Sequence, residues 1–256
     1  MNARHFALQV VALVVVAGGL VHAQTHEAVA GSSVQLGDKV VVIPAPAGFE
    51  EASTQFKEVK DRFIATEAPI NDFLLAHFPI DDCQALRNRK PIDLSRYTKV
   101  AVLKEFREKP FSDADMTATL TAFRTNGGAL LDPDGPTMKR LLENASRNLS
   151  SLEGKQIDLG FNATENLGEF DVRPEVFSVM LLFTSRMDSG GTQSITQMLS
   201  SLSFLKVRER LVYVMVYRKI SSPAALKTEL KPSMVEVKQF TTKWVNEILA
   251  ANKKER

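Results

Sequence analysis

The chain has 256 residues, of which 44% are hydrophobic and 24% charged, and its formal net charge is +2. A balance this close to neutral excludes the dense basic field that nucleic-acid binding requires, so we expect no nucleic-acid partner. Cys83 is the single cysteine, which excludes an intramolecular disulfide. The chain is long enough to bury most of its unfolded surface in one core.

Residues 1–23 have the three-part pattern of a secretory signal peptide. Arg4 precedes the uncharged apolar stretch Phe6–Leu20, and small residues follow as far as Ala23. The apolar stretch has 15 residues, whereas a helix that spans a bilayer needs about 20. We therefore predict cleavage after Ala23, a periplasmic or secreted location and no stable membrane span after cleavage. An uncleaved anchor and a buried core element are the alternatives.

The rest of the chain is expected to form one unit. Residues 24–33 are predicted to be a flexible mature N-terminus, residues 34–252 a single α+β domain and residues 253–256 a charged tail, because no repeat, low-complexity tract or linker divides them. Three Asn-x-Ser/Thr triplets matter only if the host glycosylates; they begin at Asn144, Asn148 and Asn162.

In the first half, short apolar runs alternate with segments of helical periodicity. Ser112 stands three residues before Asp115, which is the spacing of a helix-capping box. The expected elements are a strand at Val40–Ile43, a helix from about Gln55, a strand at Asn71–Pro79, a polar loop at Asp81–Lys90, a strand at Arg96–Phe106, a helix from Ser112 that stops at Asn126–Gly128, and a helix from Pro136 to Leu152.

In the second half, three strands follow one another without a crossover helix: Glu175–Met187, Thr192–Val207 and Arg210–Ile220. Such strands are most simply antiparallel neighbours. Both faces of the last strand are apolar, with Tyr213 and Met215 on one side and Val212 and Val214 on the other. The strands of an antiparallel sheet with one solvent-exposed face alternate apolar and polar residues. This strand does not, so we expect both faces of the sheet to be covered by helices.

The final helix, predicted after Pro232, places Trp244 and Ile248 on one apolar stripe. Together these patterns predict an α+β fold: a three-layer sandwich with one mainly antiparallel sheet and helices on both faces. The turn between the last two strands, at Arg208-Glu209, lacks the usual glycine or asparagine, and its type stays open.

The order of elements resembles the PsbP-like fold group, which includes extrinsic photosystem subunits and exported bacterial proteins. The resemblance rests on "IPAPAGF" at Ile43–Phe49, on "YVMVYR" at Tyr213–Arg218 and on the terminal helix with Trp244. The ending Lys243–Asn252 resembles that of uncharacterised exported proteobacterial proteins. The resemblance covers most of residues 34–252 and implies a binding or assembly role, and no site residue is carried over from it.

Few residues suggest chemistry. His77, Cys83, Asp81 and Asp82 are close enough in sequence for a mixed metal site, but paired ligand spacings are missing. His77 with Cys83 is also the only Cys–His combination, and such a pair needs an orienting third group. The default interpretations are a partly buried strand histidine and a small core cysteine.

Other motifs are incomplete. Asp132 and Asp134 resemble a calcium loop whose twelfth position is Glu143, but Pro136 breaks the pattern. There is no G-x-S-x-G nucleophile elbow, and the glycine pairs lack phosphate-loop spacing. We therefore predict no catalytic, cofactor-binding or metal residue.

The sequence favours an exported non-catalytic binding or assembly protein of the bacterial cell envelope, with an unknown protein or small-molecule partner. Its interaction surface is expected on the loops Asp81–Lys90, Asp132–Pro136 and Met187–Thr192. The alternative is an envelope hydrolase or metal-binding enzyme with a site around His77 and Cys83.

Overall fold

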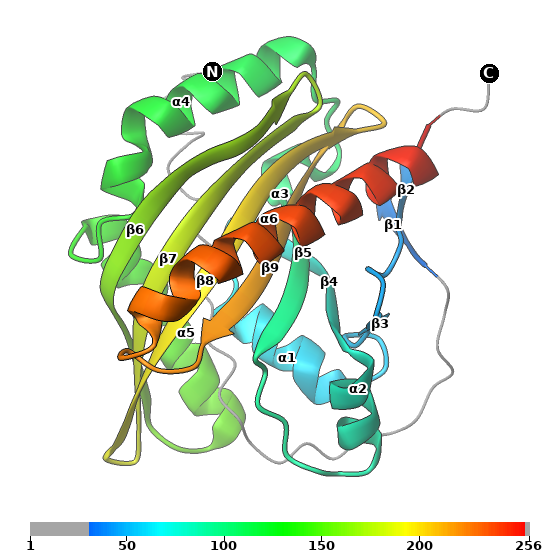
Figure 1. Cartoon of the computed structure of the whole chain (residues 1–256). Coiled ribbons are helices and arrows are strands. Elements are labelled where there is room, and N and C mark those ends of the chain that lie inside the picture. The colour runs from blue at the N-terminus through cyan, green and yellow to red at the C-terminus, as the bar shows by residue number, and fades with distance from the viewer. Residues whose placement is uncertain (1–30, 254–256) are drawn as a thin grey trace.

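The computed structural model describes residues 31–253, in which a sheet of seven antiparallel strands runs in the order β3-β4-β5-β9-β8-β7-β6 (Figure 1). A separate hairpin, β1–β2, lies beside it. The strands are β1 Ser32–Leu36, β2 Lys39–Ile43, β3 Phe49–Glu51, β4 Asn71–Pro79, β5 Arg96–Leu103, β6 Ile157–Arg173, β7 Val176–Ser189, β8 Thr192–Val207 and β9 Arg210–Ile220. The helices are α1 Lys57–Thr66, α2 Ile80–Arg87, α3 Lys104–Arg107, α4 Asp113–Leu130, α5 Pro136–Glu153 and α6 Leu226–Ala251.

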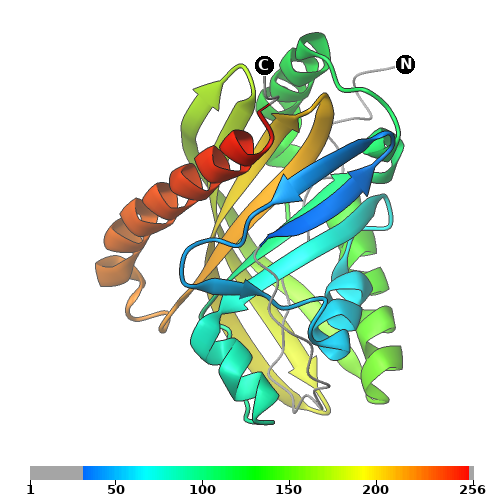
Figure 2. The same ribbon diagram turned by 90° about the vertical axis from the view of Figure 1, so that its right-hand side faces the viewer.

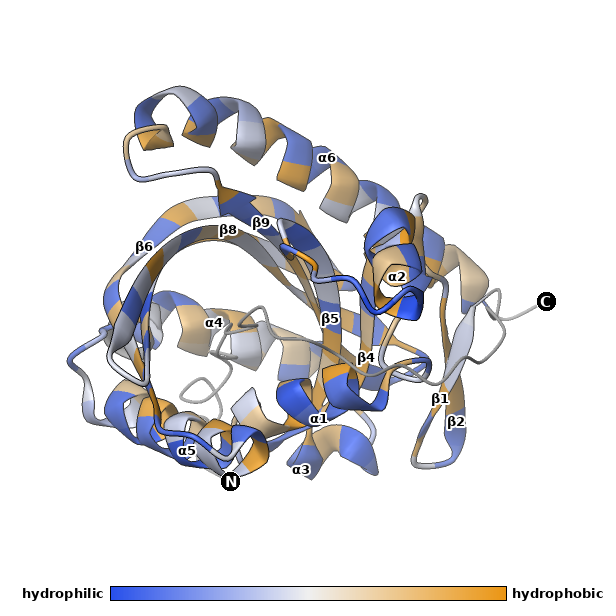
Figure 3. Cartoon of the chain, turned by 90° about the horizontal axis from the view of Figure 1, so that it is seen from below, coloured by the Kyte–Doolittle hydropathy of each residue, from blue (hydrophilic) through white to orange (hydrophobic). Residues whose placement is uncertain are grey.

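The sheet is strongly curved, and helices cover both of its sides (Figure 3). We call the concave side, toward α1, α4 and α5, the inner face, and the convex side, under α6, the outer face. The β1–β2 hairpin packs on the outer-face side through Leu36, Val41 and Ile43 (Figure 2). The predicted three-layer α+β architecture is confirmed.

The strand register explains why both faces are apolar. Leu202 pairs with Met215, and Ser203 pairs with Val214, along β8 and β9. Met215 belongs to the inner cluster of buried residues, whereas Val214 belongs to the outer cluster. Since each face is buried under helices, neither needs the polar alternation of a half-solvated sheet.

The turn between β8 and β9 is a two-residue turn with positive φ at both Arg208 (50°) and Glu209 (61°). Positive φ at both central residues is typical of a type I′ hairpin turn, which normally selects glycine or asparagine. Tertiary contacts hold the turn: Arg208 Nη1 donates to the carbonyl of Val40 at 2.8 Å, and Phe111 N donates to the carbonyl of Glu209 at 2.8 Å.

Two helix predictions need correction. The expected polar loop Asp81–Lys90 contains α2, whose first turn carries Asp81 and Asp82; carboxylates are favourable there because they complement the helix dipole. The predicted stop at Asn126–Gly128 was wrong, since α4 continues to Leu130. A glycine costs a helix only about 1 kcal/mol, which packing easily outweighs.

The edge strand β6 was not predicted, and α6 begins before Pro232 instead of after it. In β6 only Ile157 and Leu159 are buried, and its pairing with β7 shifts register near Phe161, Asn166 and Glu169. These bulges interrupt the period-two alternation by which a strand is recognised in sequence. They also hinder pairing of the exposed sheet edge with another chain. The β6 edge is further covered by α5, because Ser150 Oγ and Ser146 Oγ accept from the backbone N–H groups of Ile157 and Leu159.

The predicted signal peptide, residues 1–23, and residues 24–30 of the predicted flexible terminus lie outside the described residues, as do 254–256 of the predicted tail. β1 begins at Ser32, within the range predicted to be flexible. Across residues 31–253, none of the helices is both long and apolar enough to cross a bilayer.

Candidate binding surfaces

His77 lies on β4 and faces α6 across the outer side of the sheet. Its ring meets that of Trp244 edge-on at 5.4 Å between centroids, and its Nδ1 lies 2.9 Å from Thr98 Oγ1. Nε2 has no hydrogen-bond partner in the described structure. The side chain is fully buried, and this burial lowers the pKa of His77 to about 3, so the imidazole is neutral at physiological pH.

Cys83 lies in the second turn of α2 and packs in the inner cluster with Phe78 and Leu86. Its Sγ is 3.9 Å from the carbonyl oxygen of Phe78. Burial, reinforced by the Glu50 carboxylate, raises the pKa of Cys83 to about 12. A thiol with this pKa is protonated near neutral pH, and thiolate is the nucleophilic and metal-binding form.

The structure therefore does not bring the predicted candidates together. His77 packs against Trp244 of the outer cluster and Cys83 in the inner cluster. Asp81 and Asp82 occupy the first turn of α2. No group of three or more His, Cys, Asp or Glu residues within residues 31–253 is arranged to hold a metal ion.

The Asp132–Pro136 segment is the turn that joins α4 to α5. The Asp132 carboxylate accepts from Asp134 N at 3.0 Å, and Gly135 N donates to the Asp132 carbonyl at 3.0 Å. This is the local Asx-turn pattern that aspartate favours before a helix that begins with proline. In the Met187–Thr192 segment, β7 continues to Ser189, and a two-residue turn with positive φ at Gly190 and Gly191 leads into β8.

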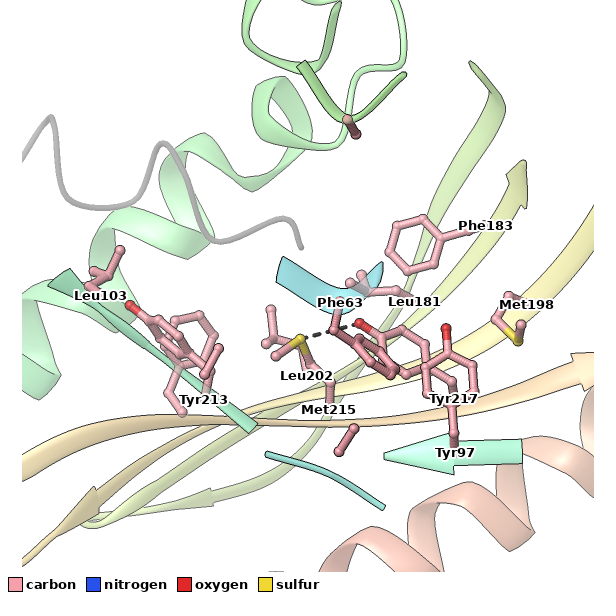
Figure 4. Packing of buried hydrophobic residues seen from close by; sticks show 14 of the residues in the cluster. Phe63, Tyr97, Leu103, Leu181, Phe183, Met198, Leu202, Tyr213, Met215 and Tyr217 are labelled. Carbon is pink, nitrogen blue, oxygen red and sulfur yellow. Dashed lines mark hydrogen bonds between the residues drawn. The ribbon is translucent and has the colours of Figure 1, made fainter. Parts of the chain in front are cut away.

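The inner face carries three fully buried tyrosines, whose rings rise from β5 and β9 toward the helices (Figure 4). Tyr97 and Tyr217 stack at 4.6 Å between centroids, and Tyr217 Oη donates to Met215 Sδ at 3.3 Å. The hydroxyls of Tyr97 and Tyr213 have no partner in the described structure. Burial raises the pKa of both phenols well above the usual value, so both hydroxyls are neutral.

A buried ion pair also lies on this side. Lys99 Nζ is 3.0 Å from Glu67 Oε2, and the two side chains are only 2% and 4% exposed. Glu67 Oε1 also accepts from Asn71 Nδ2 at 2.8 Å. The sequence did contain a signal for this pair. Lys99 lies two residues from Tyr97 and from Ala101 on β5, so a charged side chain shares a strand face with buried ones. A buried pair of this kind is weak evidence for stability but is costly to break.

Two grooves open on the surface. The first, which we call the basic groove, has a volume of about 470 Å³ and lies where the end of α6 meets the ends of β6 and β8. Its charged lining comprises Arg173, Glu175, Lys206, Arg208 and Lys253.

The second, the α5 groove, has a volume of about 630 Å³ and lies between α5 and β6. Its charged lining comprises Lys139, Glu143, Arg147, Asp158 and Arg186, so cations exceed carboxylates by only one. None of the three loops expected to form the interaction surface lines either groove. Sequence reasoning missed both grooves because each is built from segments that are distant along the chain.

No protein-family model matches this chain, and no curated protein matches it. The solved structures that are similar to it include two of Mog1. The Saccharomyces cerevisiae Ran-binding protein Mog1p is 11% identical, with a TM-score of 0.31, and the match covers 87% of this chain and 93% of that one. A point mutant of the protein Mog1 is 13% identical, with a TM-score of 0.34, over 84% of this chain and 93% of that one.

The resemblance drawn from "IPAPAGF" and "YVMVYR" is corrected by this result. The two structures described above are of Mog1, one of them from Saccharomyces cerevisiae, and they give no support for a likeness to exported proteobacterial proteins. The motifs behind that resemblance are a strand-to-turn junction after β2 and the core strand β9, which are structural features and carry no functional residue. At these identities and TM-scores, the two matches carry no inference about function.

Proposed function

We propose that this chain is an exported binding or assembly protein of the bacterial cell envelope, which engages a protein partner without covalent chemistry of its own. The observation that carries the proposal is the basic groove. It is a preformed concave surface in which cations from three separated chain segments meet. Loops and helix ends held by a rigid sheet are where binding residues concentrate.

The enzyme alternative around His77 and Cys83 has no support from the geometry. A thiol whose pKa is raised to about 12 and an imidazole whose pKa is lowered to about 3 are both held in their neutral forms. An activated cysteine needs the opposite environment, with a base in hydrogen-bond reach that stabilises thiolate.

Export is proposed from the residues before the described part, and it has its own test. We expect N-terminal sequencing of protein recovered from the native host to begin just after Ala23. Recovery of the intact chain, starting at Met1, from the cytosol would contradict export and leave the binding proposal to be judged separately.

The binding proposal is tested by affinity purification from the host envelope fraction, with a tag inserted after Ala23. We expect one partner protein in constant stoichiometry, and the same pair when the partner carries the tag. Assays against esters, peptides and phosphate esters are expected to show no turnover. Turnover that disappears in a Cys83→Ala or His77→Gln variant would overturn the proposal.

A further inference from the structure

The basic groove points to a particular kind of partner. We propose that it binds an acidic peptide segment of the partner protein, through Arg208, Lys253 and Lys206; this inference rests on the proposed function. Four of the five charged residues that line the groove are cations, and Glu175 is the fifth. The excess is local, because the whole chain carries a formal charge of only +2.

The cations differ in how far the protein already neutralises them. Arg173 donates through Nε and Nη2 to both oxygens of Asp171, at 2.8 and 2.7 Å, so it is fully paired. Lys206 pairs with Asp113, whose side chain is 80% exposed, and a pair of that kind contributes little. Arg208 and Lys253 have no carboxylate partner in residues 31–253. Two cations are therefore free to bind carboxylates, and a third is weakly held.

Hydrogen bonds hold two of the groove's cations, Arg208 and Arg173, in place. Arg208 is held by its bond to the Val40 carbonyl and by the positive-φ turn. On the opposite side, Arg173 Nη1 donates to Asn246 Oδ1 of α6 at 2.9 Å and ties the end of β6 to the helix. Charged groups that are already ordered lose little entropy when a ligand binds, which favours specific recognition.

A peptide fits the groove better than a compact phosphate does. Phosphate sites are commonly built from backbone N–H groups at a helix N-terminus, but this groove lies at the C-terminus of α6, capped by Asn252. The helix dipole places about half a negative charge there, which disfavours any anion at the helix end and most of all a compact dianion. Carboxylates spaced along an extended peptide reach the separate cations, while Val207 and Leu249 provide an apolar floor.

The test uses fluorescence anisotropy of a labelled peptide of alternating Asp and Glu, with an Asn/Gln peptide as the uncharged probe. The variant Arg208→Asn/Lys253→Gln removes the two free cations, and asparagine tolerates the positive φ at position 208. We expect the dissociation constant to rise about tenfold, since two exposed charge contacts contribute about 1–2 kcal/mol together. Raising the ionic strength from about 0.05 M to about 0.3 M should weaken binding in the wild type.

The matched control is Arg147→Gln/Arg186→Gln, which removes two cations from the α5 groove and changes the net charge equally. We expect it to bind the acidic peptide as the wild type does. Equal weakening in both double variants would show a net-charge effect and overturn the proposal. Displacement of the peptide by millimolar inorganic phosphate would also overturn it, because the site would then be a simple anion site.

The outcomes separate this inference from the proposed function. If the partner co-purifies equally with wild type and with Arg208→Asn/Lys253→Gln, the groove inference fails and the binding function stands. If no partner co-purifies but the wild type binds the acidic peptide selectively, the groove inference is supported and the proposed function fails.

Discussion

The outer face of the sheet and its inner face differ in how their buried hydroxyl groups are paired. On the outer face, serine and threonine hydroxyls are paired: Ser201 Oγ lies 2.6 Å from Thr241 Oγ1, and Ser178 Oγ lies 2.7 Å from Ser203 Oγ. The exception among its buried polar atoms is His77 Nε2, which has no partner in the described structure. On the inner face, the hydroxyls of Tyr97 and Tyr213 have no partner in the described structure, and a Lys–Glu pair is buried.

The reason for the difference is what covers each face. One long helix packs closely on the outer face, and its core is mostly aliphatic. Several shorter helices cover the curved inner face, whose core includes many aromatic side chains that reach further. Large aromatic rings fill that space. A tyrosine ring also carries a hydroxyl, and a buried hydroxyl without a hydrogen-bond partner costs about 1–3 kcal/mol. Buried hydroxyls are therefore better paired on the outer face than on the inner face.

The largest expected effect is on the outer face. Trp244→Ala removes a buried ring and its Nε1 bond to the Pro44 carbonyl, which measures 2.7 Å. We expect the free energy of unfolding to fall by about 4 kcal/mol, measured by urea denaturation. The neighbouring Lys243→Ala, at an exposed position, is the control and should change stability by less than about 0.5 kcal/mol. Similar losses in both would contradict the outer-face packing.

The next effect tests the inner face. Lys99→Met leaves Glu67 buried without its cation, and we expect a loss of about 3 kcal/mol in unfolding free energy. Adding Glu67→Leu removes the orphaned charge and should restore most of that loss, because a buried pair replaced by apolar residues is often neutral. A double variant no more stable than Lys99→Met would show that the pair is needed for more than charge balance.

The pH dependence of stability reports on the outer face. The pKa of His77 is lowered to about 3 by burial, so below about pH 6.5 the unfolded chain binds a proton that the folded chain does not. Stability that is complete above pH 6.5 is therefore lost as pH falls toward 3. We expect this residue to account for about 2 kcal/mol between pH 6 and pH 4. Urea denaturation at a series of pH values gives the unfolding free energy as a function of pH. We expect this free energy to fall less steeply toward low pH in His77→Gln than in the wild type. An equally steep fall in both would contradict the assignment.

The smallest expected effect is a change in unfolding free energy that has opposite signs on the two faces when one buried hydroxyl is removed. Tyr213→Phe removes a buried hydroxyl without a partner and should raise the unfolding free energy by about 1 kcal/mol, whereas Ser201→Ala breaks the bond to Thr241 and should lower it by about 1 kcal/mol. Thermal unfolding of the two variants gives the comparison. A loss of stability in Tyr213→Phe would show that this hydroxyl has a partner.

The spacing of apolar residues correctly predicted the strands and helices that have at least one fully buried face. It found β7, β8 and β9 as antiparallel neighbours, α5 from Pro136, and the capping box at Ser112, whose Oγ accepts from Asp115 N at 3.1 Å. It missed β6 because bulges and exposure on the edge erase alternation. It took α2 for a loop because eight residues are too short for a clear helical pattern.

The apolar residues at successive strand positions were enough to predict a sheet covered on both faces, and the helical segments of the same chain were the available cover. The separation of His77 from Cys83, and the meeting of Arg173, Arg208 and Lys253 in one groove, became visible when the chain was seen folded. The periodicity of apolar residues shows which face of a helix or strand is buried, because that face is made by residues close together in the sequence. Grooves and charge partners depend on where distant segments come together, and no local pattern encodes that.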